Sequence, residues 1–248
     1  MKLTATPLIC GVAALAATAA PLSAAYIDVS SFNLGTTSYD GWGKASEPTT
    51  TLTRANYPDY ATSSGGVGTL PSYASPWAQP LGSNTAGSGD ALFNKTSGSG
   101  AFAGAGLYQA GGTGSFSVSD STALTGLSTV VFQMEVNYLD TGASFSDTAV
   151  SLVINGITYT PAFSTYFSQS AGDAAVLASN KIFAYQWDLT GVAGVSSFAV
   201  NWDGPSSSGQ ITSLQLTQGT TFTQVVPEPS AAFLGSIAAG LLVLRRRR

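Results

Sequence analysis

Acidic side chains are the one set of groups in the central part of this 248-residue chain that could support catalysis. The chain has no histidine, and its single cysteine, Cys10, lies in an apolar run near the N-terminus. This composition excludes a Ser-His-Asp triad, a histidine-ligated zinc, a cysteine nucleophile and a disulfide scaffold. The remaining candidates for acid–base chemistry are Glu135, Asp140, Asp147, Asp188 and Asp203.

Glycoside hydrolysis is the reaction that such a set suits best, and it needs two carboxyl groups about 5 to 10 Å apart. Glu135 lies in the middle of an expected strand, on its polar face, where glycosidases also place such acids. A solvated sheet face explains the same residue as well. We therefore expect a non-enzymatic protein without catalytic residues, and keep a glycan-active enzyme that uses Glu135 as the lesser alternative.

Aromatic side chains offer a second kind of chemistry, because exposed rings stack on sugars. Trp42 and Trp77 lie in loop-like sequence, together with several tyrosines. These rings either form a sugar platform or cap the core, and the second interpretation is favoured. We retain Trp42 and Trp77 as possible sugar contacts, which makes a carbohydrate-binding module the leading alternative function.

Two Asp-Gly pairs, Asp40-Gly41 and Asp203-Gly204, lack the run of spaced oxygen ligands that a calcium cage needs. Both pairs are typical of turns. The turn interpretation is therefore favoured over a structural calcium with ligands from separate loops, and the sequence assigns no metal ligand and no cofactor.

The elements that would position these groups are β-strands, because hydrophobic side chains recur with a period of two. Val130, Phe132, Met134 and Val136 share one face of an expected strand, whose other face is polar. Further strands are expected at 26–32, 100–108, 114–120, 150–154, 157–160, 181–189, 196–202, 211–217 and 220–225. Residues 33–99 are expected to form long loops with a few strands.

Turn chemistry and the absence of a long helical period together define the fold class. Asn155-Gly156 joins two alternating runs and predicts a tight hairpin. We expect an all-β antiparallel β-sandwich over residues 26–225, with a jelly roll as first choice and an immunoglobulin-like sandwich as runner-up. The stretch 181–216 resembles lectin-like or carbohydrate-binding-like jelly rolls at the level of fold only.

The charge of the body argues against nucleic acid as a partner. Residues 26–226 carry four basic and twelve acidic side chains, a net charge of −8. Such a surface repels phosphates.

The N-terminus has the pattern of a secretory signal peptide. Lys2 precedes an apolar run over 8–20, and Pro21 ends that run. Small residues at 23–25 then suit signal peptidase, with cleavage between Ala25 and Tyr26. We therefore expect residues 1–25, which form a signal helix, to be removed on export.

The C-terminus combines a proline motif, an apolar run and a basic cluster. Val226-Pro227-Glu228-Pro229-Ser230 is followed by an uncharged run from Ala231 to Leu244. The chain then ends in Arg245, Arg246, Arg247 and Arg248. A helix over the apolar run would be about 21 Å long, short for a hydrocarbon core of about 30 Å, although snorkelling arginines and local thinning narrow the difference. This pattern predicts a transmembrane helix in the inner membrane with its arginines retained in the cytoplasm.

These three parts, in this order over residues 226–248, resemble a PEP-CTERM sorting signal. The resemblance implies that an exosortase of a Gram-negative, exopolysaccharide-producing bacterium recognises Pro227-Glu228-Pro229 and removes the tail. The chain would then be transiently anchored in the inner membrane and finally reside on the cell surface or in the extracellular matrix. We therefore expect a signal peptide (1–25), a sandwich domain (26–225) and a sorting signal (226–248), with exopolysaccharide as a possible further partner.

Overall fold

The computed structural model describes residues 26–43, 76–77, 80–83, 89–102, 106–109, 112–138, 149–169, 179–205 and 209–226. The expected signal peptide and the sorting signal beyond Val226 lie outside these residues. The described residues form thirteen strands in two antiparallel sheets, with one short 3-10 helix and no α-helix. The prediction of an all-β sandwich is therefore confirmed.

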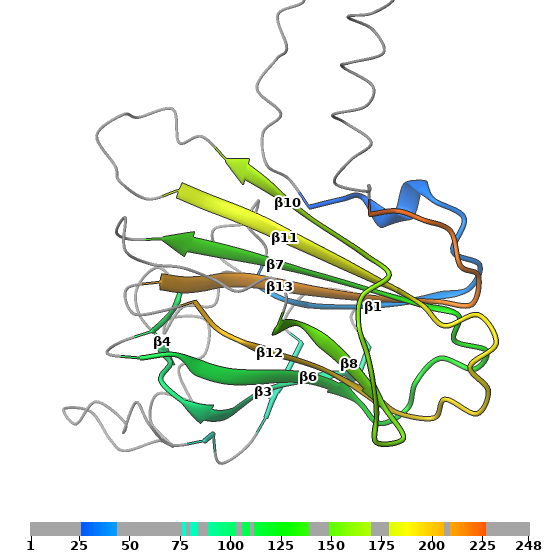
Figure 1. The fold of residues 1–248 in the computed structure, drawn as a ribbon, viewed down its shortest axis with the longest axis horizontal. Helices are drawn as coiled ribbons and strands as arrows, with labels where there is room; N and C mark the ends of the chain where they lie inside the picture. Colours follow the sequence, from blue (N-terminus) through cyan, green and yellow to red (C-terminus); the bar gives the residue numbers. More distant parts are fainter. Residues whose placement is uncertain are drawn as a thin grey trace, which may run out of the picture.

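The first sheet has seven strands and forms the upper layer in Figure 1. Its order is β10-β11-β7-β13-β5-β4, and β1 also pairs with β13. The bounds are β1 Thr37–Trp42, β4 Ala101–Phe102, β5 Leu107–Tyr108, β7 Thr129–Tyr138, β10 Phe163–Gln169, β11 Ser179–Asp188 and β13 Gly209–Gly219.

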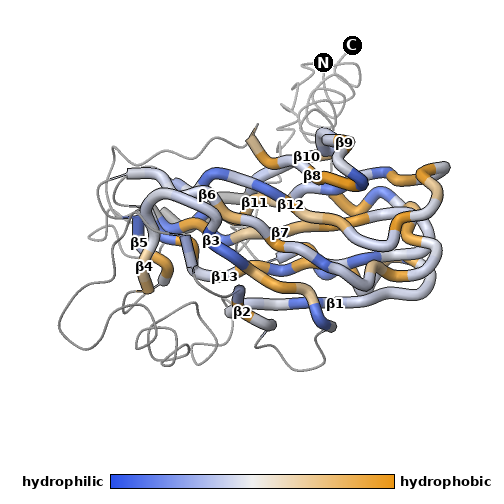
Figure 2. The backbone as a smooth tube through the Cα atoms, turned by 90° about the horizontal axis from the view of Figure 1, so that it is seen from below, coloured by the Kyte–Doolittle hydropathy of each residue, from blue (hydrophilic) through white to orange (hydrophobic). Residues whose placement is uncertain are grey.

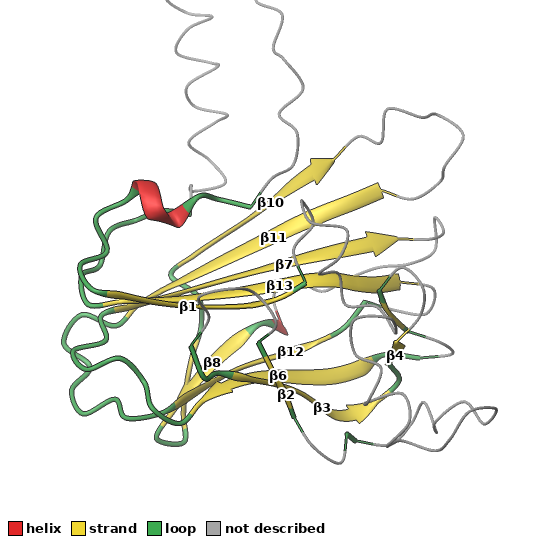
Figure 3. Cartoon of the chain, turned by 180° about the vertical axis from the view of Figure 1, so that it is seen from behind, coloured by secondary structure: helices red, strands yellow, loops and turns green. Residues whose placement is uncertain are grey.

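The second sheet has six strands, in the order β2-β3-β6-β12-β8-β9, and lies below the first. The bounds are β2 Leu81–Gly82, β3 Leu92–Gly98, β6 Gly114–Asp120, β8 Ser151–Ile154, β9 Ile157–Tyr159 and β12 Phe198–Asp203. The chain crosses between the two sheets from β6 to β7 and again from β11 to β12, and both crossings lie at the same end of the sandwich (Figure 3).

The core fills the space between the sheets, because every second side chain of the central strands points inward. Apolar and polar segments alternate along the strands in Figure 2. Val130, Phe132, Met134 and Val136 of β7 are all buried in one core cluster, as their spacing predicts. Across from them, Trp202 of β12 has its ring centroid 4.9 Å from that of Phe132.

The Asn155-Gly156 hairpin joins β8 to β9 as predicted. Asn155 has φ 53° and Gly156 has φ 78°, so both turn residues occupy the left-handed region that this tight turn demands. Asparagine and glycine tolerate that region better than other residues, which is why the pair is a reliable local signal.

The two ends of the domain form an additional layer on the outer face of the seven-stranded sheet. We call residues 26–36 the N-terminal arm and residues 220–226 the C-terminal arm. The two arms run side by side in Figure 1, as the blue and orange segments above the sheet. They enclose a second small core, whose buried residues are Leu34, Val131, Ala184, Val225 and Val226.

Neither arm is a strand, so the strands expected at 26–32 and 220–225 are wrong. The Oδ1 atom of Asp28 accepts from the backbone N–H of Ser30 at 3.1 Å, and this turn starts the 3-10 helix Val29–Ser31 (η1).

Strand β10 was not expected, although Phe163, Thr165 and Phe167 alternate with polar neighbours there. In the part of the chain that the structure describes, no helix is long and apolar enough to cross a membrane.

Candidate functional site

Glu135 is buried rather than solvated, because the N-terminal arm covers the polar face of β7. Only 3% of Glu135 is exposed. Its Oε2 accepts from Ser213 Oγ at 3.2 Å, and Ser213 Oγ lies 2.5 Å from the hydroxyl of Tyr26. Since Ser213 gives its one proton to Glu135, the Tyr26 hydroxyl is the donor to Ser213. Burial raises the pKa of Tyr26 well above its ordinary value, and the nearby Glu135 carboxylate raises it further.

Glu135 has no close second carboxylate in the described candidates Asp188 and Asp203. Asp188 lies on the same outer face as Glu135, but the strand register separates them by six positions, or about 20 Å along the strands. Asp203 lies in the other sheet and follows the inward-facing Trp202. Its side chain therefore points outward, away from the core and from the sheet that holds Glu135. Asp140 and Asp147 lie outside the described residues. Neither Asp188 nor Asp203 therefore lies at the spacing from Glu135 that glycoside hydrolysis needs.

Trp42 and Trp77, the possible sugar contacts, are buried in the main core. Trp42 is 0% exposed and donates its indole N–H to the carbonyl of Leu81 at 3.1 Å. Trp77 is 7% exposed, and its ring stacks on Phe102 and meets the edge of Phe93. Neither ring can stack on a sugar in this arrangement, which corrects the sugar-contact interpretation and agrees with the capping one.

Asp40 is not in a turn, which corrects that expectation. It lies inside β1, paired with Leu216, and is 1% exposed. Both carboxylate oxygens are buried without a well-formed hydrogen bond. Burial, together with the charges of Asp120 and Asp90, raises the pKa of Asp40 to about 6, and the amide of Ala91 offsets only part of this effect. No group of three or more histidine, cysteine or acidic side chains among the described residues could hold a metal ion.

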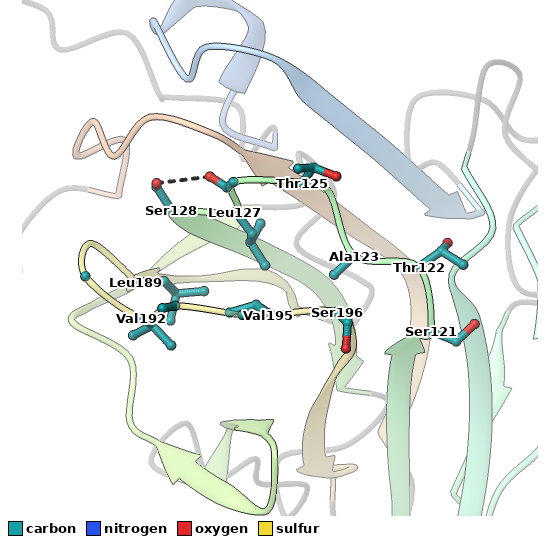
Figure 4. Close-up of a pocket in the computed structure, with 14 residues that line it drawn as sticks. Ser121, Thr122, Ala123, Thr125, Leu127, Ser128, Leu189, Val192, Val195 and Ser196 are labelled. Atoms are coloured by element: carbon teal, nitrogen blue, oxygen red, sulfur yellow. Dashed lines mark hydrogen bonds between the residues drawn. The ribbon is translucent and has the colours of Figure 1, made fainter.

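A groove opens at the end of the sandwich where the β6–β7 and β11–β12 connections lie (Figure 4). Residues 121–128 form one wall and residues 189–196 contribute to the other, around a volume of about 740 Å³. The Ala123 amide donates to the Ser196 carbonyl at 3.0 Å, so the two loops are tied together. The lining side chains are hydroxyls and small apolar groups without charge or aromatic rings. Such a lining can exchange hydrogen bonds with a neutral ligand but cannot perform acid–base chemistry.

Two glutamines on the outer face of the seven-stranded sheet hold the arms. Gln133 Oε1 accepts from the Ile27 amide at 2.7 Å, and its Nε2 donates to the Ile27 carbonyl at 3.1 Å. Gln186 Nε2 donates to the Thr223 carbonyl at 2.8 Å. Gln186 Oε1 accepts from the amides of Val225 at 2.8 Å and Val226 at 3.2 Å. Each side chain bonds to the arm as a neighbouring peptide group would.

The arms are also bonded to each other. The Thr221 amide donates to the Leu34 carbonyl at 2.9 Å, and the Thr223 hydroxyl donates to the Asn33 carbonyl at 2.7 Å. No local sequence pattern indicates this pairing, because the partners lie about 190 positions apart. The ends of the body, at Tyr26 and Val226, are therefore fixed on one face of the molecule.

These features define an antiparallel β-sandwich with a closed aromatic core, both ends fixed on one outer face and a neutral groove at one end. No protein-family model, curated protein or solved structure matches the chain.

Proposed function

We propose that this chain is an exported, non-enzymatic envelope or extracellular-matrix protein that an exosortase processes at Pro227-Glu228-Pro229. One structural observation supports the proposal most strongly. Gln133 and Gln186 hold Ile27 and Val226 on the same face, over the neighbouring strands β7 and β11. A signal peptide before Tyr26 and a membrane tail after Val226 would therefore both leave the domain from that face. The body could then be tethered twice to one membrane without strain.

The proposal further assigns the sandwich to the jelly-roll class. Support comes from the order of the strands. The chain leaves one sheet for the other between β1 and β2, β3 and β4, β5 and β6, β6 and β7, β7 and β8, β9 and β10, β11 and β12, and β12 and β13. Repeated crossing of this kind is a property of double-sheet jelly rolls, and a meander would keep consecutive strands in one sheet.

The processing part of this proposal is tested in an exosortase-producing Gram-negative host. Replacing the motif by Ala in a Pro227→Ala/Glu228→Ala/Pro229→Ala chain should leave the tail attached and the protein in the inner membrane. The unaltered chain should lose the tail and reach the cell surface. Equal processing of both chains would refute recognition of the motif.

Binding of a neutral exopolysaccharide is the second candidate function, and the hydroxyl-lined groove favours it. The groove contributes Ser121, Thr122, Thr125, Ser128 and Ser196, and none of its lining side chains is charged. Placing a long side chain at the exposed Thr125, as in Thr125→Arg, should abolish binding to a glycan array while leaving stability unchanged. Hydrolysis of a glycan that is lost in Glu135→Gln would instead favour the third candidate, an enzyme.

A further inference from the structure

The segment directly before the sorting motif is docked onto the domain as far as its last residue. Val225 is 4% exposed and Val226 is 0% exposed. Gln186 alone makes three hydrogen bonds to this segment, one to a carbonyl and two to amides. One residue further along the chain, Pro227 begins the motif.

Side-chain packing reinforces the docking. The ring of Phe222 stacks on that of Phe163 with centroids 6.1 Å apart and planes at 19°. Val225 and Val226 pack with Val131 and Ala184 of the sheet in the second small core. If the segment left the sheet, it would expose these apolar side chains and leave Gln186 without its three partners.

A docked segment is a poor substrate for a protease. Enzymes that cut peptides commonly bind an extended stretch of chain, pairing with its backbone groups in the manner of an added strand. Gln186 already occupies the amides of Val225 and Val226, so those groups cannot pair with an enzyme at the same time. Cleavage close to Pro227 then depends on the fraction of molecules in which the segment is released.

We infer that Gln186 is a positioning residue that restricts access to the sorting motif: it keeps residues 223–226 docked, and processing occurs from the released form. This inference rests on the proposed function. The folded body of the protein then regulates the rate of processing, whereas the tail carries the signal that the enzyme recognises. The sandwich would then influence how long the chain stays anchored before it is delivered.

The test compares processing rates of full-length chains by pulse-chase in the exosortase-producing host. Gln186→Ala should be processed on the order of tenfold faster, because loss of its hydrogen bonds raises the released fraction by about that factor. Gln133→Ala is the matched control, since it removes an equivalent amide on the same sheet that holds the other arm. Its processing rate should stay close to that of the unaltered chain.

A second chain carries a short Gly-Ser insertion between Val226 and Pro227, which moves the motif away from the docked segment. It should be processed fast whether residue 186 is glutamine or alanine. Hydrogen exchange on the purified full-length Gln186→Ala chain should show faster exchange over 223–226 and unchanged protection in β7 and β13, which separates release of the arm from unfolding.

The outcomes distinguish the two proposals. If the unaltered chain is never processed, or is processed without the Pro-Glu-Pro motif, the proposed function fails. If processing requires the motif but neither Gln186→Ala nor the insertion accelerates it, the inference about Gln186 is overturned and the proposed function stands.

Discussion

Gln133 and Gln186 present to the arms the same donor and acceptor that a neighbouring peptide group would present. A buried glutamine left without partners would destabilise the fold, since each unmet polar group costs about 1–3 kcal/mol. Here the amides satisfy backbone groups of two non-strand segments, which could not otherwise be buried. These two residues therefore explain why the arms remain attached without belonging to a sheet.

Asp40 gives a pH-dependent prediction at the residue scale. Because its pKa is raised from 3.8 to about 6 in the folded protein, the folded state binds more protons than the unfolded state between these values. The contribution of Asp40 to stability is then lost as the pH rises through this window. Asp40→Asn should stabilise the protein by about 1–3 kcal/mol at pH 7.5, and this gain should shrink toward pH 4.

Urea unfolding across that pH range measures the effect of the Asp40 substitution. Asp203→Asn, at an exposed carboxylate, is the control and should change stability by less than about 0.5 kcal/mol. If Asp40→Asn instead lowered the free energy of unfolding by the same amount at every pH, the carboxylate would be needed as a hydrogen-bond acceptor.

Trp42 gives a prediction that separates packing from ligand binding. Since its ring is fully buried and contacts Phe93, Trp42→Ala should lower the free energy of unfolding by about 3–5 kcal/mol. Ile157→Ala, at a side chain that is 59% exposed, should cost less than about 1 kcal/mol. Loss of glycan binding by a Trp42 variant that keeps its full stability would contradict this assignment.

At the scale of elements, β6 begins at a position that admits no side chain. A Cβ atom on Gly114 would lie 1.7 Å from the carbonyl oxygen of Ser99, which is a backbone atom and cannot rotate away. Gly114→Ala should therefore destabilise the protein by more than about 3 kcal/mol. Gly82 in β2 is the matched control, because a Cβ atom added there would have no other atom within 4 Å.

Thermal unfolding of the two glycine variants provides the measurement. Gly82→Ala should unfold within a few degrees of the unaltered protein, whereas Gly114→Ala should show a large decrease in Tm or fail to fold. Similar Tm values for both variants would mean that the approach of Ser99 to β6 is not part of the native fold.

The sequence predicted those elements whose signal is local. The alternation along β7 and the Asn155-Gly156 turn depend on neighbouring residues, and both were predicted correctly. The arms were misjudged, because Ile27 is held by a residue 106 positions away. No local pattern reports such a partner.

The candidate site was less predictable than the fold for a similar reason. The type and spacing of Glu135 indicate a polar face, but they do not reveal that Tyr26 covers it. Trp42 stands in sequence without clear alternation, so its burial depends on the contact with Phe93 in a strand about 50 residues later. The error at Glu135 concerns what covers a correctly predicted strand, whereas the error at Trp42 concerns a strand, β1, in a region that was expected to be mainly loops.

At the scale of the whole molecule, the fold brings the two ends of the described body, Tyr26 and Val226, to one face. The hydrogen bond between Leu34 and Thr221 brings the arms together before they cross the sheet, so the ends of the body leave the domain from the same face. The groove between residues 121–128 and 189–196 lies apart from this face, at the end of the sandwich. A ligand could bind there while the protein is still anchored, under the proposed topology.

Mass spectrometry of the mature protein from native cells tests the central claim most directly, because it reports both ends of the chain in one experiment. We expect a mature chain that starts at Tyr26 and ends near the Pro227-Glu228-Pro229 motif, without the arginines at 245–248. A surface protein that retains the apolar run and all four arginines would contradict it.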